Sequence, residues 1–268
     1  MAIILDGKKL SNKILNNLKA EIKKKRLKLK LAVILIGDNK ISQIYIREKK
    51  NACLKIGIGF ELFRFPLDIS QSDLRKEIVK IVKNPENSGV VIQLPLPKHF
   101  NSQEILNLIP PEKDIDVLSG KSSSFSIISP VVKAISELLK EYKISLKNKN
   151  IVVVGKGKLV GQPLILWLEK EKANFSVIDQ KTKDISIFTK KADIIISGTG
   201  KPNLITGNTI KEGAIVIDAG TSSESGRTIG DVDFESVSKK AKYITLVRGG
   251  VGPMTVACLL KNLVKLNS

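Results

Sequence analysis

The chain has 268 residues, 42% of them hydrophobic, and its 45 Lys and Arg against 26 Asp and Glu give a formal net charge of +19. This composition is typical of a soluble globular protein, and lysines interrupt every apolar run before it reaches the roughly 18 residues of a membrane helix. One histidine, His99, and two distant cysteines, Cys53 and Cys258, exclude nitrogen- and sulfur-ligated metal sites and histidine-based triads.

Apolar, β-branched runs alternate with helical patterns, which predicts α/β layers around mostly parallel strands. The segment 107–126 is rich in Pro, Ser and charge and predicts a domain boundary. Ser129 and Pro130 then predict the start of a helix. In the first part of the chain we expect strands at 31–36, 61–65 and 89–93 and helices at 8–25, 42–56 and 72–82.

The second part of the chain begins with a fully apolar strand, Ile151–Val154, followed by a glycine turn and a helix from about Val160. Gly155, Gly157 and Gly161 form G-x-G-x-x-x-G, one residue longer than the usual dinucleotide fingerprint. Glycines at such a turn let backbone N–H groups approach a pyrophosphate at the helix N-terminus. A nucleotide-binding fold is predicted, with further strands at 175–179, 192–197 and 213–220.

The residues that follow the second strand of this unit leave the cofactor open. Asp179 stands where a carboxylate accepts hydrogen bonds from the ribose 2′-hydroxyl of NAD. Lys156, Lys181 and Lys183 are near enough in sequence to neutralise the 2′-phosphate of NADP instead. The acidic residue favours NAD and the lysines favour NADP.

Polar residues in the first part of the chain are candidates for chemistry. Tyr45 and Lys49 are four residues apart, so they share one face of the predicted helix. Gln93 follows a buried strand, where its amide either holds a neighbouring amine or satisfies the loop backbone. Asp114 and Asp116 either recognise a heterocycle edge or belong to an ordinary surface loop.

A glycine-rich stretch, RGGVGPMTVA, precedes a helix expected to begin near Met254. Backbone this bare lets a ligand come close, although a tight turn between domains has the same composition. Both cysteines stand in apolar surroundings and are expected to be core residues.

The positive charge is distributed along the chain, with one denser run, KKKRLKLK, at 23–30. Aromatic residues make up only 4%, whereas nucleic-acid sites combine basic and stacking side chains. We therefore favour surface lysines over a nucleic-acid site. The N-terminus has too few apolar residues before Asp6 for a secretory signal, so a cytoplasmic protein without a membrane partner is expected.

Nine stretches, in order, resemble one family of enzymes. They are ILDGKKL, GDNKISQIYIREKK, VIQLPLP, PEKDID, GKGKLVGQP, GTGKP, IKEGAIVIDAG, GDVDF and GGVGPMT. The family is the bifunctional methylenetetrahydrofolate dehydrogenase/methenyltetrahydrofolate cyclohydrolase, or FolD, family. The resemblance implies a folate substrate, NADP with NAD possible, roles in one-carbon metabolism and purine biosynthesis, and a homodimer.

The resemblance also implies two α/β lobes. The first is a folate-binding catalytic domain, 1–119, joined by a C-terminal helix, 251–268, that returns to it. The second, 120–250, is a Rossmann-type parallel-sheet domain for NAD(P). In this family an oxidation to 5,10-methenyltetrahydrofolate is followed by hydrolysis to 10-formyltetrahydrofolate.

The residues that match the family's motifs acquire roles from the resemblance. Tyr45 and Lys49 match the catalytic pair, Gln93 the residue that contacts the lysine, and Asp116 the residue that holds the pterin, whereas Lys50 is expected at the surface. The substrate-binding matches are Ser42, Gly250, Gly252, Pro253 and Thr255. The cofactor-binding matches are Gly155, Lys156, Gly157, Val160, Gly161, Gly198 and Thr199, with Asp179 and Lys181 beside them.

Some positions depart from the family's pattern. Val117 replaces the usual glycine after the second aspartate, and Gly157 replaces a serine in the glycine loop. Arg248 replaces a proline before GGVGPMT, and Asp179 and Gln180 replace a pair that begins with histidine. Two alternatives follow, namely a cyclohydrolase with weak or lost dehydrogenase activity and a folate- or nucleotide-binding protein without turnover.

Overall fold

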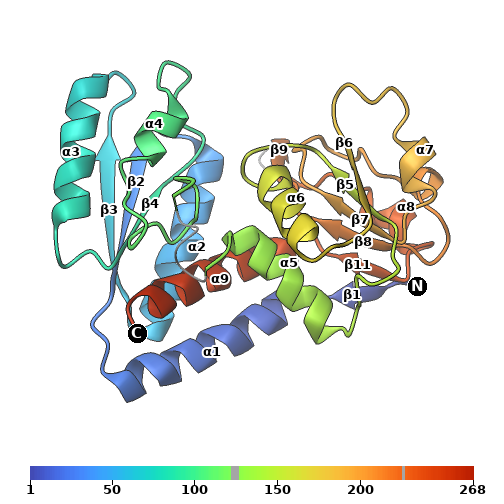
Figure 1. The fold of residues 1–268 in the computed structure, drawn as a ribbon, viewed down its shortest axis with the longest axis horizontal. Helices are drawn as coiled ribbons and strands as arrows, with labels where there is room; N and C mark the ends of the chain where they lie inside the picture. Colours follow the sequence, from blue (N-terminus) through green and yellow to red (C-terminus); the bar gives the residue numbers. More distant parts are fainter. Residues whose placement is uncertain (122–126, 225–226) are drawn as a thin grey trace. The chain divides into compact units, whose positions relative to one another are not determined.

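The computed structural model describes residues 1–121, 127–224 and 227–268. The chain divides into two compact units, each with its own parallel sheet (Figure 1). The three-stranded unit comprises Asn12–Pro130 and Val256–Ser268, and the six-stranded unit comprises Met1–Ser11 and Val131–Thr255. The predicted two-domain α/β class is confirmed.

The sheet of the three-stranded unit has the order β3-β2-β4 with all strands parallel. Each strand is followed by a helix, as the alternating pattern predicted. The strands are β2 (Lys30–Ile36), β3 (Gly59–Phe65) and β4 (Gly89–Ile92), and the helices that follow them are α2 (Lys40–Ile56), α3 (Gln71–Lys83) and α4 (Ser102–Leu106). Two further helices, α1 (Gly7–Lys25) and α9 (Val251–Leu266), lie mostly in this unit, but their first residues, up to Ser11 and Thr255, belong to the six-stranded unit.

Alternate residues of the central strand β2 face opposite sides of this sheet, because side chains alternate along a strand. Leu31, Val33 and Leu35 lie in a core with α1, α2 and α9. Ala32 and Ile34 lie in a second core with α3 and α4. Helices therefore cover both faces, and the last helix packs in the three-stranded unit as predicted.

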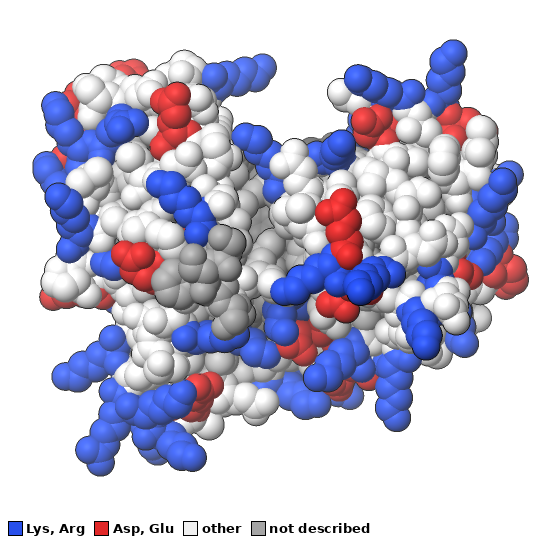
Figure 2. Space-filling model, viewed as in Figure 1, with Lys and Arg blue, Asp and Glu red and all other residues white. Residues whose placement is uncertain are grey.

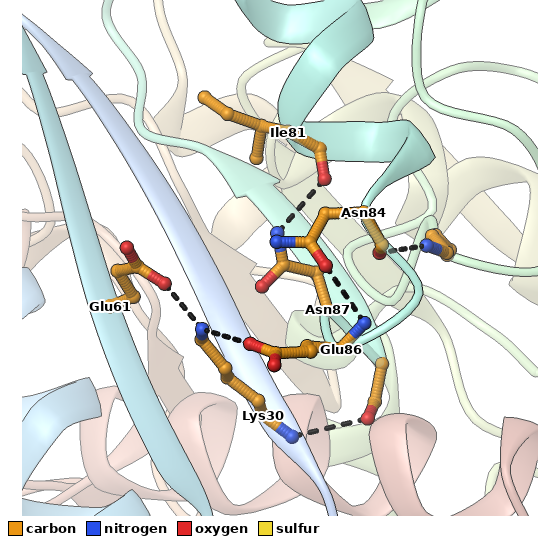
Figure 3. Close-up of polar contacts among 8 residues, drawn as sticks. Lys30, Glu61, Ile81, Asn84, Glu86 and Asn87 are labelled. Atoms are coloured by element: carbon orange, nitrogen blue, oxygen red, sulfur yellow. Dashed lines mark hydrogen bonds and ion pairs between the residues drawn. The ribbon is translucent and has the colours of Figure 1, made fainter.

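Polar contacts hold the connection between α3 and β4 (Figure 3). Lys30 Nζ pairs with the carboxylates of Glu61 at 2.5 Å and Glu86 at 3.2 Å. The side-chain amide of the fully buried Asn87 donates to the Ile81 carbonyl at 2.9 Å. Lys113 Nζ donates to two carbonyls at the end of α3. These contacts fix the point at which β4 enters the sheet.

The sheet of the six-stranded unit has the order β1-β11-β8-β7-β5-β6, again all parallel. Its strands are β1 (Ile3–Leu5), β5 (Ile151–Val154), β6 (Phe175–Ile178), β7 (Ile194–Ser197), β8 (Ile215–Asp218) and β11 (Tyr243–Thr245). The other elements are α5 (Pro130–Glu141), α6 (Gly161–Lys170), α7 (Ser186–Thr189), α8 (Phe234–Ser238), a 3₁₀ turn at Gly207–Thr209 and an antiparallel pair, β9 (Ser222–Glu224) and β10 (Arg227–Ile229).

The structure differs from the expected arrangement at two places. Residues 1–11 were expected in the catalytic domain, but β1 pairs with β11 and extends the six-stranded sheet. The last helix begins at Val251 rather than near Met254, because Gly252 and Pro253 occupy its first turn, where proline is tolerated. The expected boundary segment, 107–126, lies partly outside the described residues.

Among the described residues, no helix is both long enough and apolar enough to cross a membrane. Basic side chains are spread over the visible face, with acidic ones among them, and a group of basic side chains lies by the end of α1 (Figure 2). Lys23, Lys24 and Lys25 form the last turn of α1, where cations interact favourably with the helix dipole.

Asn262 of α9 provides a test of how the last helix is anchored. Its buried side-chain amide donates to the carbonyls of Ile115 and Ile128, both at 2.9 Å. Asn262→Ala leaves both acceptors without this donor, so we expect the free energy of unfolding to fall by about 2 kcal/mol in urea titrations. The control Asn16→Ala, at an exposed position on α1, should change it little; equal values for the two variants would contradict this role.

Candidate functional site

Helix α2 presents the predicted catalytic residues because its start is fixed by a cap. Asn39 precedes the helix, and its side-chain oxygen accepts a hydrogen bond from the Ser42 amide at 3.0 Å. Gly57 ends the helix in the left-handed conformation, with φ of 82°. Ser42 and Lys49 are buried, Tyr45 is half-buried and Lys50 is exposed, so the expectation for Lys50 is confirmed.

The structure brings Lys49 and Gln93 together. Lys49 Nζ donates to Gln93 Oε1 at 2.8 Å, and both side chains are buried. Gln93 Nε2 donates in turn to the Leu94 carbonyl at 2.9 Å, and that carbonyl also accepts from Ser42 Oγ at 3.2 Å. The amide of Gln93 is therefore held with its oxygen toward the lysine. The geometry shows both roles that were open for Gln93, because its oxygen accepts from the amine and its nitrogen donates to a loop carbonyl.

Burial controls the charge of the Lys49 amine. Desolvation lowers the pKa of Lys49 below its ordinary value, and the nearby charge of Asp116 only partly opposes this. Burial likewise raises the pKa of Asp116, while the lysine pulls it down and Asp114 pushes it up. Each group therefore changes the protonation of the other. An amine whose neutral form is accessible can accept and return a proton.

The two aspartates of the KDID segment have different surroundings. The Asp114 carboxylate accepts hydrogen bonds from the amides of Leu118 at 3.3 Å and Ser119 at 2.9 Å, so it organises its own loop. Asp116 interacts electrostatically with Lys49 instead. The structure thus favours a structural role for Asp114 and leaves Asp116 as the candidate beside the amine.

Cys53 and Cys258 are both buried as thiols, so their assignment to the core is confirmed. Cys53 lies one turn of α2 after Lys49, and burial raises the pKa of its thiol to about 12. At neutral pH it therefore contributes no thiolate to the site.

The glycine loop of the six-stranded unit follows β5. This strand lies between β6 and β7 in the sheet. Open parallel sheets bind ligands at the carboxyl ends of the strands, where the order reverses, and β5 and β7 flank that point. A side chain at Gly161 would lie 2.2 Å from the Gly155 carbonyl oxygen, and one at Gly198 would lie 2.5 Å from Val160. These glycines are required by close packing of strand, turn and helix.

Gly157 differs from the other glycines of this loop. A side chain added there would meet nothing within 4 Å. The position is exposed, so the fold accommodates the serine that the family usually has. Gly157 in place of serine therefore does not change the backbone of the loop. Backbone N–H groups at such a turn suit a dinucleotide pyrophosphate.

The residues after β6 form a tight turn. Asp179 Oδ1 accepts a hydrogen bond from the Lys181 amide at 2.8 Å. The side chains of Lys156, Lys181 and Lys183 are exposed. The aspartate thus has a local role in the turn.

The remaining predicted substrate residues lie at the start of α9, in the six-stranded unit. Gly250 is buried, and a side chain there would lie 2.2 Å from the Leu246 carbonyl oxygen. Gly252, Pro253 and Thr255 follow in the first turns, and Thr255 Oγ1 donates to the Val251 carbonyl at 3.0 Å. The close packing accounts for the glycine at 250 without a ligand.

Sequence reasoning assigned no role to two buried carboxylates of the six-stranded unit, Asp218 and Asp231. Burial and the neighbouring Asp231 raise the pKa of Asp218 to about 6, against hydrogen bonds from three backbone amides. The signal was present in the sequence, because Asp218 ends a fully apolar strand in IVID and Asp231 stands in GDVDF.

Both units match models of one protein family. Residues 5–116 match the tetrahydrofolate dehydrogenase/cyclohydrolase catalytic domain, and residues 129–268 match the NAD(P)-binding domain of the same family. Among curated relatives, the bifunctional protein FolD of Nautilia profundicola is 47% identical over 275 residues, which cover 98% of this chain and 96% of the relative. That of Hydrogenobaculum sp. is 44% identical, with coverage of 98% and 97%.

Solved structures agree with these matches. The bifunctional FolD enzyme of Campylobacter jejuni superposes with a TM-score of 0.91 at 40% identity, covering 100% of this chain and 99% of that one. The methylenetetrahydrofolate dehydrogenase-cyclohydrolase of Trypanosoma brucei, solved with NADP and an inhibitor, gives a TM-score of 0.91 at 33% identity, with coverage of 99% and 97%.

Val117 gives a test of strain beside the site. It has φ of 58°, in the left-handed region that a β-branched residue rarely adopts. Val117→Gly should relieve this strain and, after the entropy cost of glycine, raise the free energy of unfolding by about 1 kcal/mol in urea titrations. The control Val117→Ala keeps a Cβ and should give no comparable gain; a less stable glycine variant would show that the loop is not strained.

Proposed function

Because the chain belongs to the tetrahydrofolate dehydrogenase/cyclohydrolase family, we propose that it oxidises 5,10-methylenetetrahydrofolate with NADP and hydrolyses the product to 10-formyltetrahydrofolate. The observation that carries the proposal is the buried amine of Lys49, hydrogen-bonded to Gln93 Oε1 at 2.8 Å. Hydrolysis of the methenyl group needs a residue that accepts a proton and returns it. A lysine with a lowered pKa is suited to that task.

Hydrolysis begins when water adds to the methenyl carbon and continues when the bond from that carbon to N5 breaks. Neutral Lys49 accepts one proton from the attacking water and returns it to N5 as the bond from the carbon to N5 breaks. The remaining hydroxyl proton is released to solvent as the formyl C=O forms, which balances the positive charge of the methenyl substrate. Gln93 orients the amine, and its own orientation is fixed by the Leu94 carbonyl. Tyr45, one turn earlier on α2, orients the lysine and substrate, while Asp116 holds the pterin and Ser42 contributes to substrate binding.

For NADP, backbone N–H groups of the glycine turn at the start of α6 would bind the pyrophosphate. Gly155, Gly161 and Gly198 permit the close packing that forms this turn. Bound NADP supplies a hydride acceptor for the methylene carbon of the folate. Val160, Gly157 and Thr199 would line the same loop, and Lys156 and Lys181 would neutralise a 2′-phosphate. Gly250, Gly252, Pro253 and Thr255 would contribute to folate binding, as the family resemblance implies.

The glycines that form the turn after β5 are present and closely packed. They argue against the alternative of a cyclohydrolase that has lost its dehydrogenase activity. A buried amine beside an oriented amide likewise argues against a protein that only binds folate, because binding alone does not require a proton carrier. We also propose that the chain acts in the cytoplasm, since both cysteines are thiols, and that it forms a homodimer through the six-stranded unit, where Leu166 and Ile187 are exposed apolar residues.

Lys49→Met tests the catalytic role. Loss of the proton carrier should lower the rate of methenyltetrahydrofolate hydrolysis, followed by its absorbance, by roughly 10² to 10⁴. The matched control Lys50→Met removes an exposed charge from the next residue and should hydrolyse normally. Circular dichroism establishes that both variants are folded; hydrolysis at the wild-type rate in folded Lys49→Met would refute the assignment.

Asp179→Asn tests the cofactor preference. The amide oxygen can still accept the Lys181 hydrogen bond, but the negative charge that disfavours a 2′-phosphate is gone. The ratio of kcat/KM for NADP to that for NAD should therefore rise roughly two- to fivefold.

Asp184→Asn is the matched control for this experiment, because Asp184 accepts from the Ser186 amide in the same way, at 2.8 Å. Its ratio of NADP to NAD efficiency should not change. An unchanged ratio in Asp179→Asn as well would place the Asp179 carboxylate away from the 2′-position.

A further inference from the structure

Asp231 lies directly behind the loop that follows β7. Its Oδ2 accepts a hydrogen bond from Ser197 Oγ at 2.6 Å and another from the Thr199 amide at 2.6 Å. Ser197 is the last residue of β7, and Thr199 follows Gly198. One carboxylate oxygen therefore binds both sides of the glycine. These two hydrogen bonds hold the loop on both sides of Gly198.

The held loop forms part of the glycine-loop surroundings. Val154 of β5 pairs with Ser197 of β7, so Gly155 and Gly198 leave adjacent strands at the same level. A side chain at Gly155 would lie 3.0 Å from Thr199 Cγ2 and 3.1 Å from the Gly198 carbonyl oxygen. A displacement of Gly198 and Thr199 would therefore move the atoms against which Gly155 packs.

Asp218 in turn holds the main chain at Asp231. Its Oδ1 accepts from the amides of Gly220 at 2.9 Å and Asp231 at 3.3 Å, and its Oδ2 accepts from Val232 at 3.1 Å. Two glycines permit this approach, because a side chain at Gly230 would lie 2.0 Å from the Asp218 carboxylate and one at Gly220 would lie 2.1 Å from that of Asp231. The carboxylates thus link the ends of β8 and β7.

Asp218 and Asp231 are suited to hold the backbone in place. Both side chains are buried, Asp231 completely, and removing such a carboxylate from water is costly unless donors replace the water. Four backbone amides and one hydroxyl donate to both oxygens of Asp218 and to Oδ2 of Asp231. Asp231 Oδ1 is buried and has no hydrogen-bond partner among the residues that the structure describes. In the described part of the chain, no group of three or more His, Cys, Asp and Glu side chains could hold a metal ion.

We propose that Asp231 is a positioning residue for the dinucleotide, whose carboxylate sets Gly198 and Thr199 in the place that the cofactor requires, with Asp218 as its support. The proposal rests on the dehydrogenase function proposed above. Asp231 acts through the loop and does not touch the cofactor. Its side chain serves as an acceptor, so an amide of the same shape should replace it better than a methyl group.

Three variants test this role. Asp231→Ala removes the acceptor for Thr199 and Ser197 and should weaken binding of NADP alone, measured by titration calorimetry, roughly tenfold to a hundredfold. Asp231→Asn keeps an acceptor oxygen and should restore most of the affinity. Asp233→Asn, the same change two residues along, should bind NADP as the wild type does, because the Asp233 side chain does not cap α8.

A purely structural role would predict a different outcome. General loss of structure lowers NADP affinity and methenyltetrahydrofolate hydrolysis together, whereas loss of positioning lowers NADP affinity far more than hydrolysis. Wild-type NADP affinity in folded Asp231→Ala would overturn the proposal. Equal losses in the alanine and asparagine variants would also overturn it, since the acceptor would then not be the relevant feature.

Amide hydrogen exchange of the wild-type protein without cofactor keeps the proposal testable if Asp231→Ala does not fold. The Thr199 amide should be protected by its bond to Asp231, and fast exchange at Thr199 would overturn the proposal. Hydrogen exchange and NADP binding by the wild-type protein together separate the positioning role of Asp231 from the dehydrogenase function. A wild-type protein that neither binds nor reduces NADP refutes the proposed dehydrogenase function, whereas exchange at Thr199 reports on the loop itself.

Discussion

The hydrogen bond from Lys49 Nζ to Gln93 Oε1 is the interaction on which the candidate site depends. It joins α2 to the residue that follows β4, in a place where both side chains are buried. An amide oxygen accepts a bond from the amine without adding a negative charge, so burial still lowers the pKa of the lysine. A carboxylate in the position of Gln93 would hold the amine as a permanent cation and prevent its use as a proton acceptor.

Parallel strands explain why both candidate sites occur where they do. In each unit the strands end at one edge, so residues that follow different strands meet there although they are far apart in sequence. Gln93 meets the helix that follows β2 in this way, and Gly198 meets the turn that follows β5. Each unit therefore gathers polar groups at one edge and keeps an apolar core behind them.

Much of this could be predicted from sequence, because α2 and β5 have strong periodic or fully apolar patterns. The strand β1 could not, since three residues at the chain's start have no periodicity and pair with residues 243–245. The resemblance selected Asp116 over Asp114, but the hydrogen bonds by which Asp114 organises its own loop required coordinates. Motif matching selected Gly198 and Thr199 but not Asp231, whose contacts with them arise only when distant strands pair.

The buried carboxylate of Asp231 and the buried amine of Lys49 have different roles. Lys49 is buried with few opposing charges, so its protonation can change during a reaction. Two donors occupy Oδ2 of Asp231, so this oxygen can hold backbone in a fixed position. Both groups are removed from water, and the partners differ, with a neutral acceptor beside Lys49 and donors at Asp231 Oδ2. A proton carrier must remain able to lose its charge, whereas a support for a cofactor loop must retain its acceptor.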